Sequence, residues 1–183
     1  GVYDSNGEMD FYSLKGIVEE LLCALCINDY DVELASPECS FDEYSAFHPG
    51  RTAVLKKNDE EFGIFGELHP KVQENYDIGA RTYIAKLNIP EMMKLADVEK
   101  TYKPLPKYPA TTRDLSLVCD DKIPVASLEK AIKSAVGKIL EKVTLFDVYK
   151  GEQIESGKKS VSYSISMRSH DGTLTDEQAD AAM

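Results

Sequence analysis

The sequence contains no tryptophan and only four cysteines, and none of its apolar runs approaches the roughly 20 residues that a membrane-spanning helix requires. We therefore expect neither a membrane partner nor a small domain that depends on disulfides. With 183 residues, the chain is long enough to bury hydrophobic cores in one or two domains without such crosslinks. Free thiols without a pairing pattern favour a reducing compartment, so we expect a cytoplasmic protein.

Cys23 and Cys26 have the C-x-x-C spacing of a redox pair or of half a zinc site. A zinc site needs two further ligands at a suitable spacing, and the sequence has no second pair of this kind. A thioredoxin-like pair begins a helix, where the helix dipole activates the thiol, whereas this pair comes late in the apolar periodic run 17–27. We therefore interpret both cysteines as small buried apolar residues and expect no metal site.

Basic residues are also scarce, with 21 lysines and arginines against 32 aspartates and glutamates, for a formal net charge of −11. This balance argues against a general nucleic-acid-binding surface, which requires a basic face. The excess of acid is confined to residues 1–100, which hold 20 acidic and 9 basic residues, whereas residues 101–183 hold 12 of each. The two halves therefore differ in character, and the charge of the second half does not exclude a local contact with RNA.

The first segment, residues 1–98, is predicted to be an α+β domain with a mostly antiparallel sheet, because its strands follow one another without long crossover helices. Strands are predicted at residues 32–35, 52–55, 62–68 and 81–87, and short helices at 70–76 and 91–96. Asp10 is a suitable N-cap for an amphipathic helix before them. The apolar residues expected on the buried stripe of this helix are Phe11, Leu14, Ile17 or Val18, Leu21 and Leu25.

A proline-rich stretch separates this segment from the rest of the chain. Three of the six residues from 104 to 109 are proline, which prevents a helix and favours an extended connector, so we place a domain boundary near residue 99. In residues 99–183 we predict strands at 113–118, 143–149 and 160–168, a helix from Pro124, and another helix after a capping box that begins at Thr175. The order β-α-β-β-α is one strand short of the ferredoxin-like β-α-β-β-α-β motif, so we expect a domain truncated at its end.

Several motifs give the sequence a family resemblance. They are Lys107–Pro109, Arg113–Val118, Leu145–Gly151, Gly157–Ser164, Arg168 and Thr173–Glu177 in the second segment, and Asp10–Gly16, Phe47–Ala53 and Gly66–Pro70 in the first. By these motifs the second segment resembles the ferredoxin-fold anticodon-binding domain of the phenylalanyl-tRNA synthetase β-subunit family. The first segment resembles the end of the class II synthetase-like module of the same subunits, which is catalytic-like in fold and inactive.

The resemblance implies part of an α₂β₂ ligase that joins phenylalanine to tRNA(Phe) with ATP and Mg²⁺. The implied partners are tRNA(Phe), the catalytic α subunit and a second αβ pair, and the first segment is expected to serve in assembly. The sequence itself contains no glycine-rich phosphate loop and no class II signature in which an arginine pairs with a following acid. We therefore expect no catalytic residue, metal ligand or cofactor in this chain, which alone should be inactive.

The resemblance also places the wobble end of the anticodon against the sheet of the second segment. An unpaired base needs an aromatic face for stacking and polar groups for its edge. Strand alternation puts Phe146 and Val148 on one face, expected to be that of the helices, and Asp147 and Tyr149 on the other. The expected tRNA-binding residues are Asp147, Tyr149 and Ser160 for the base, and Lys150, Lys158, Lys159 and Arg168, clustered around one hairpin, for the backbone.

These residues also have ordinary structural interpretations. Tyr149 suits a cross-strand packing position at a sheet edge, and the lysine pair 158–159 suits a solvated turn. Arg113 and Asp114 suit a local ion pair of little energetic value. The resemblance is what raises the binding interpretation above these alternatives.

His48 and His69 lie in separate loops with no acid or cysteine at ligand spacing, so a structural hydrogen bond is expected for each, rather than a metal. Arg51 is expected to pair with one of the acids around it. An enzyme that uses one of the two histidines is one alternative function. Another is a ferredoxin-like ligand-sensing regulatory domain fused to an acidic interaction module, which predicts a small-molecule pocket at a domain edge.

Overall fold

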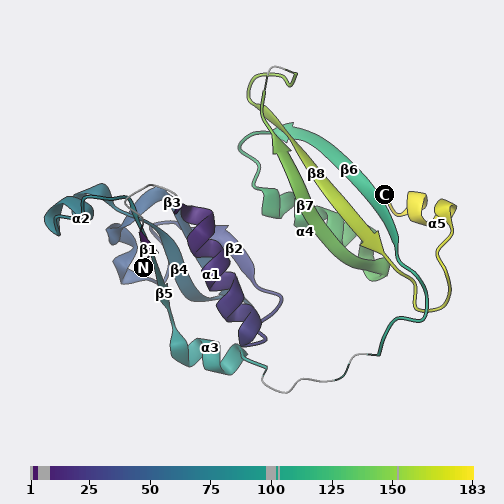
Figure 1. Ribbon diagram of the computed structural model, residues 1–183, viewed down its shortest axis with the longest axis horizontal. Helices are drawn as coiled ribbons and strands as arrows, with labels where there is room; N and C mark the ends of the chain where they lie inside the picture. Colours follow the sequence, from purple (N-terminus) through teal and green to yellow (C-terminus); the bar gives the residue numbers. More distant parts are fainter. Residues whose placement is uncertain (1, 4–8, 98–101, 103, 152) are drawn as a thin grey trace. The chain divides into compact units, whose positions relative to one another are not determined.

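The computed structural model describes residues 2–3, 9–97, 102, 104–151 and 153–183. The chain divides into two compact units, Gly1–Thr101 and Tyr102–Met183, and each has its own sheet and hydrophobic core (Figure 1). The domain boundary predicted near residue 99 lies outside the described residues. Both sheets are antiparallel and carry helices, which confirms the α+β class.

The sheet of the first unit has the strand order β1-β5-β4-β3-β2. Its strands are β1 Val2–Tyr3, β2 Asp31–Leu34, β3 Phe47–Lys57, β4 Glu60–Leu68 and β5 Thr82–Leu87. The hairpin between β3 and β4 turns at Asn58 and Asp59, whose φ angles of 52° and 65° are left-handed. Asn and Asp tolerate this conformation, and two such residues match the right-handed twist of the strands that they join.

The helices of the first unit begin where side chains cap them. They are α1 Phe11–Ala24, α2 Pro70–Asn75 and α3 Ile89–Leu95, with a short 3₁₀ helix η1 at Asp42–Ala46. The Asp10 carboxylate accepts the Ser13 amide at 2.8 Å at the start of α1, and Asn88 caps α3 in the same way. Helix α1 lies across one face of the sheet against β4 and β5 (Figure 1).

The buried stripe of α1 differs from the prediction at its C-terminal end. Leu14, Val18 and Leu22 are buried, whereas Leu21 is 41% exposed, because steps of four residues keep this stripe over the sheet. Cys23 follows Leu22 by about 100° around the helix and is exposed, and Cys26 is half-buried beyond the helix end. The prediction of two buried thiols is therefore wrong.

The second unit has a three-stranded sheet in the order β6-β8-β7 and the predicted β-α-β-β-α succession. Its elements are β6 Thr111–Asp120, α4 Val125–Val136, η2 Gly137–Ile139, β7 Leu140–Tyr149, β8 Lys158–Met167 and α5 Asp176–Ala181. Strand β8 lies at the centre, and four of its alternate residues are fully buried in the core with α4 and α5: Val161, Tyr163, Ile165 and Met167. The serines between them face the other side, as the alternation predicts.

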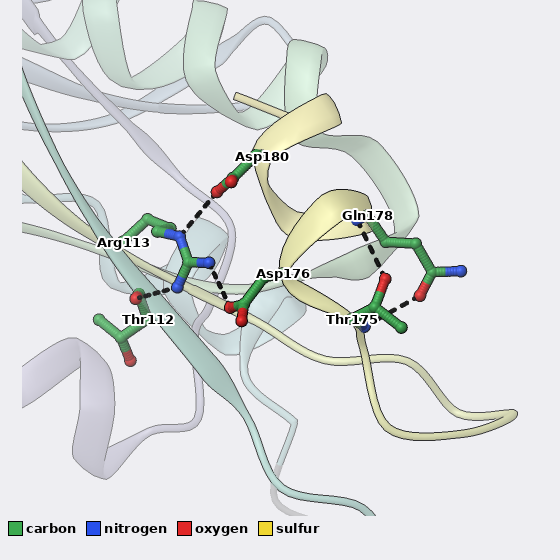
Figure 2. A network of polar contacts seen from close by, with 6 residues as sticks. All are labelled: Thr112, Arg113, Thr175, Asp176, Gln178 and Asp180. Carbon is green, nitrogen blue, oxygen red and sulfur yellow. Dashed lines mark hydrogen bonds and ion pairs between the residues drawn. The ribbon is translucent and has the colours of Figure 1, made fainter.

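Helix α5 is tied to β6 by Arg113, as Figure 2 shows. The guanidinium donates from Nε to Asp180 at 2.9 Å and from Nη2 to Asp176 at 2.6 Å, and these two carboxylates raise the pKa of Arg113. The alternative pairing with Asp114 is wrong, because consecutive strand residues point to opposite faces. Thr175 caps α5 through the predicted capping box.

Candidate nucleic-acid interface

One face of the β6-β8-β7 sheet points away from α4 and α5, and we call it the open face. Residues directly opposite each other in antiparallel strands share a face, so the serines of β8 identify the members on both neighbouring strands. The open face consists of Thr112, Asp114, Ser116 and Val118 on β6, Ser160, Ser162, Ser164 and Ser166 on β8, and Lys142, Thr144, Asp147 and Tyr149 on β7.

The three residues predicted to contact a base lie together at one end of this face. Tyr149 is directly opposite Ser160, and Asp147 is opposite Ser162 in the next row. Tyr149 is 41% exposed, Asp147 is exposed and Ser160 is half-buried. The Asp147 carboxylate makes no hydrogen bond or ion pair with any residue that the structure describes, so its oxygens are free to accept.

The sequence analysis missed two further polar groups beside Asp147. The hydroxyl oxygens of Ser116 and Ser162 are 2.9 Å apart and form the middle of the same row. The available signal was the serine at every second position of β8, which marks a polar strand face lined with groups that both donate and accept.

A register shift between Leu145 and Asp147 determines which side chains reach the open face. Val143 and Leu145 pair opposite core residues, so counting by two along the strand would place Asp147 and Tyr149 toward the helices. A bulge inserts one extra residue, Phe146, and moves both residues to the open face. Phe146 is 57% exposed, so its predicted place under the helices is wrong.

The lysines near Tyr149 are engaged by groups of the same unit. Lys150 Nζ lies 2.5 Å from the Asp121 carboxylate and holds the pKa of Asp121 below its usual value, and Lys158 Nζ lies 2.6 Å from Glu155. Lys159 is buried and donates to the carbonyl oxygens of Asp121 at 3.0 Å and of Ile123 at 2.6 Å. The solvated-turn interpretation is therefore wrong for Lys159, which braces the loop between β6 and α4.

Arg168 lies at the opposite end of β8 from the two lysines. It follows the last residue of the strand, whereas Lys158 begins it, and ten strand residues span about 33 Å. Its guanidinium donates to Glu141 at 3.0 and 3.1 Å and to the carbonyl oxygen of Tyr108, and it lowers the pKa of Glu141. The prediction that all four basic residues cluster around one hairpin is wrong.

Two known domain families match the chain in order. The family described as Phenylalanyl tRNA synthetase beta chain CLM domain matches residues 1–89, and the Ferredoxin-fold anticodon binding domain matches residues 106–183. The phenylalanine–tRNA ligase beta subunits of Clostridium tetani, Clostridium acetobutylicum and Bacillus subtilis are 49%, 41% and 40% identical over 94%, 95% and 95% of this chain. The chain belongs to the phenylalanine–tRNA ligase β-subunit family. It spans 21% of the length of each of these three relatives.

The open face lies in the part of the chain that matches the Ferredoxin-fold anticodon binding domain. The match favours neither the ligand-sensing alternative nor an enzyme built on a histidine. The antiparallel sheet of the first unit and the match of the second unit to the Ferredoxin-fold anticodon binding domain argue against the histidine enzyme.

Both histidines of the first unit, His48 and His69, make local hydrogen-bonding contacts. His69 caps α2, where its Nδ1 accepts the Lys71 amide at 3.1 Å, and His48 Nδ1 lies 2.8 Å from the Pro49 carbonyl oxygen. Arg51 donates to the buried Glu67 at 2.8 Å, which confirms that it pairs with an acid.

Among the residues that the structure describes, no group of three or more His, Cys, Asp or Glu side chains could hold a metal ion. Among the helices that the structure describes, none has both the length and the apolar character to cross a membrane.

Proposed function

We propose that this chain supplies the anticodon-binding part of a phenylalanine–tRNA ligase β subunit, and that the open face receives the unpaired wobble base. The observation that carries the proposal is the juxtaposition of Asp147, Tyr149 and Ser160 at one end of that face. The complete enzyme is an α₂β₂ assembly that charges tRNA(Phe) with phenylalanine by means of ATP and Mg²⁺, in the cytoplasm. Its chemistry takes place outside this chain, which only recognises tRNA and assembles.

The side chains at this end suit recognition of a purine edge. The Tyr149 ring offers a surface on which a base can stack, a contact worth about 1–3 kcal/mol per base. The Asp147 carboxylate only accepts hydrogen bonds, and a guanine presents two adjacent N–H donors on its Watson–Crick edge. An adenine presents an acceptor at the corresponding ring nitrogen, so Asp147 favours guanine at this position.

Lys150 and Lys158 are the residues proposed to contact the phosphates of the RNA backbone. Each lysine already has an acidic partner, but exposed ion pairs are worth only about 0–1 kcal/mol, so a phosphate can replace Asp121 or Glu155 as the partner. Lys159 is buried and Arg168 lies at the far end of β8, so both are outside the proposed contact. Recognition therefore depends more on the base than on the RNA backbone.

The first unit, with the excess of acid, is assigned to assembly with the α subunit and the second αβ pair. Support comes from its match to the beta chain CLM domain family and from a charge that repels RNA. Residues 1–98 form this assembly domain, and residues 99–183 form the anticodon-binding domain.

Tyr149→Ala in the complete enzyme tests the proposal. We expect tRNA(Phe) to bind roughly 5- to 150-fold more weakly, which corresponds to the stacking contribution, while the formation of phenylalanyl adenylate stays unchanged. Filter binding measures the first quantity, and pyrophosphate exchange measures the second. Tyr76→Ala removes an exposed tyrosine of the first unit and should alter neither. Equal tRNA affinity in wild type and Tyr149→Ala would exclude Tyr149 as the stacking surface.

A further inference from the structure

The hydroxyl end of the Tyr149 ring lies over the α-carbon of Gly151. A methyl group added to Gly151 would lie 2.6 Å from Cζ of Tyr149 and 3.2 Å from Cε1, both closer than ordinary van der Waals contact. Strand β7 ends at Tyr149 and the chain bends at Gly151, which lies beneath the ring. The ring therefore occupies the space that any other side chain at 151 would fill.

The backbone of Gly151 does not require glycine. Its φ angle lies outside the left-handed region, in contrast to Gly157, whose φ is +86°. The backbone beneath the ring is also held in place, because the Gly151 carbonyl accepts the Ile154 amide at 3.0 Å and the side chain of Lys150 is bound to Asp121. The three described atoms nearest to a side chain at 151 all belong to Tyr149.

We propose that Gly151 is a positioning residue for Tyr149 and sets the orientation in which the ring meets a base. This inference rests on the proposed function of the open face. With glycine at 151, the ring lies along the end of β7 with its hydroxyl end against the chain, beside Ser160 in the same row. Any larger residue displaces the hydroxyl end and changes the orientation of the stacking surface relative to Asp147 and Ser160.

The displacement can be separated from a loss of folding. The atoms nearest to the added methyl group are at the far end of a flexible, 41% exposed side chain, so the ring moves and the backbone does not. Gly172 offers a matched control in the same unit, because nothing lies within 4 Å of a methyl group added there and its φ is not left-handed. Both alanine variants should unfold at the wild-type temperature.

Binding of tRNA(Phe) to the complete enzyme is the functional test. We expect Gly151→Ala to weaken binding at least about 5-fold, up to the loss seen in Tyr149→Ala, and Gly172→Ala to bind as wild type does. In the Tyr149→Ala background, Gly151→Ala should cause no further loss, because the two residues act as one unit. Provided that Tyr149→Ala weakens binding, wild-type affinity in Gly151→Ala, or an equal loss in both backgrounds, would overturn the inference.

Fluorine NMR of the chain labelled with 3-fluorotyrosine follows the ring without RNA. The Tyr149 signal is the one that disappears in Tyr149→Phe, and it should shift in Gly151→Ala and stay in place in Gly172→Ala. If Tyr149→Ala leaves tRNA binding unchanged, the proposed function fails, and the fluorine signal alone decides whether Gly151 positions the ring. An unmoved signal in Gly151→Ala would overturn the inference whatever the binding data show.

Discussion

Replacing Tyr163 by phenylalanine tests how the core of the second unit is linked to α4. Tyr163 lies on the central strand β8 with its side chain fully buried, and its hydroxyl donates to the Val125 carbonyl oxygen at 3.1 Å, at the start of α4. Burial raises the pKa of this hydroxyl to about 12, from an ordinary value of 10.0. The variant keeps the ring and removes only the hydrogen bond and the titrating group.

The difference in the free energy of unfolding between wild type and Tyr163→Phe should fall as the pH rises. At neutral pH the lost hydrogen bond should lower the free energy of unfolding by about 0.5–1.5 kcal/mol. A raised pKa means that the neutral hydroxyl stabilises the folded state, fully below pH 10 and progressively less as the pH rises toward 12. Wild type should therefore lose about 1.4 kcal/mol by pH 11, a loss that Tyr163→Phe cannot show. The difference between the two proteins should therefore shrink as the pH rises and reach zero or reverse sign by pH 11.

Urea unfolding followed by circular dichroism at pH 8, 9.5 and 11 measures this difference. Tyr30, whose pKa is also raised by burial, is present in both proteins, so its contribution cancels. Tyr12→Phe removes an exposed hydroxyl and controls for the substitution itself. A difference between wild type and Tyr163→Phe that stays constant from pH 8 to pH 11 would refute the assignment of the alkaline loss to Tyr163.

Two matched pairs of variants test other parts of the fold. Leu22→Ala should lower the free energy of unfolding by about 2–5 kcal/mol because it leaves a cavity under α1, whereas Leu21→Ala should change it by at most about 0.5 kcal/mol; equal losses would contradict the observed stripe. Lys159→Met should lower the thermal midpoint because two loop carbonyl oxygens lose their donor, whereas Lys158→Met should leave it unchanged. A midpoint that falls equally in both lysine variants would show that Lys159 does not brace the loop.

The sequence was sufficient wherever a local contact decides the structure. Asp10 and Thr175 each predict a helix start, and each caps a helix through the amide three residues ahead. Alternation along β8 predicts its core face because this central strand is paired on both sides and buries every second side chain from Val161 to Met167. These features depend on neighbours within a few positions along the chain.

The predictions from sequence are wrong where the position of a side chain depends on a residue far away along the chain. The bulge at Phe146 follows from how β7 pairs with β8, and the phase of alternation cannot be counted across it. Lys159 is buried because the loop after β6 passes over it, and Arg113 reaches acids more than 60 residues away. The prediction that Asp147 and Tyr149 lie on the face away from the helices agrees with the structure, since the bulge precedes both and Val148 between them pairs with the buried Val161.

The ion pairs of Lys150 and Lys158 show how the charges of the second unit are balanced near the open face. The second unit carries equal numbers of acidic and basic residues from 101 to 183, and the neutrality also holds locally, because Lys150 and Lys158 each have an acidic partner. A phosphate approaching this end of the open face must replace an existing carboxylate, so it gains little beyond what the pair already provides. The base has no such competitor, since the Tyr149 ring is partly exposed and the Asp147 carboxylate has no partner among the described residues. Under the proposed function, we therefore expect a neutral face of this kind to bind weakly to RNA in general and to prefer the base that satisfies Asp147.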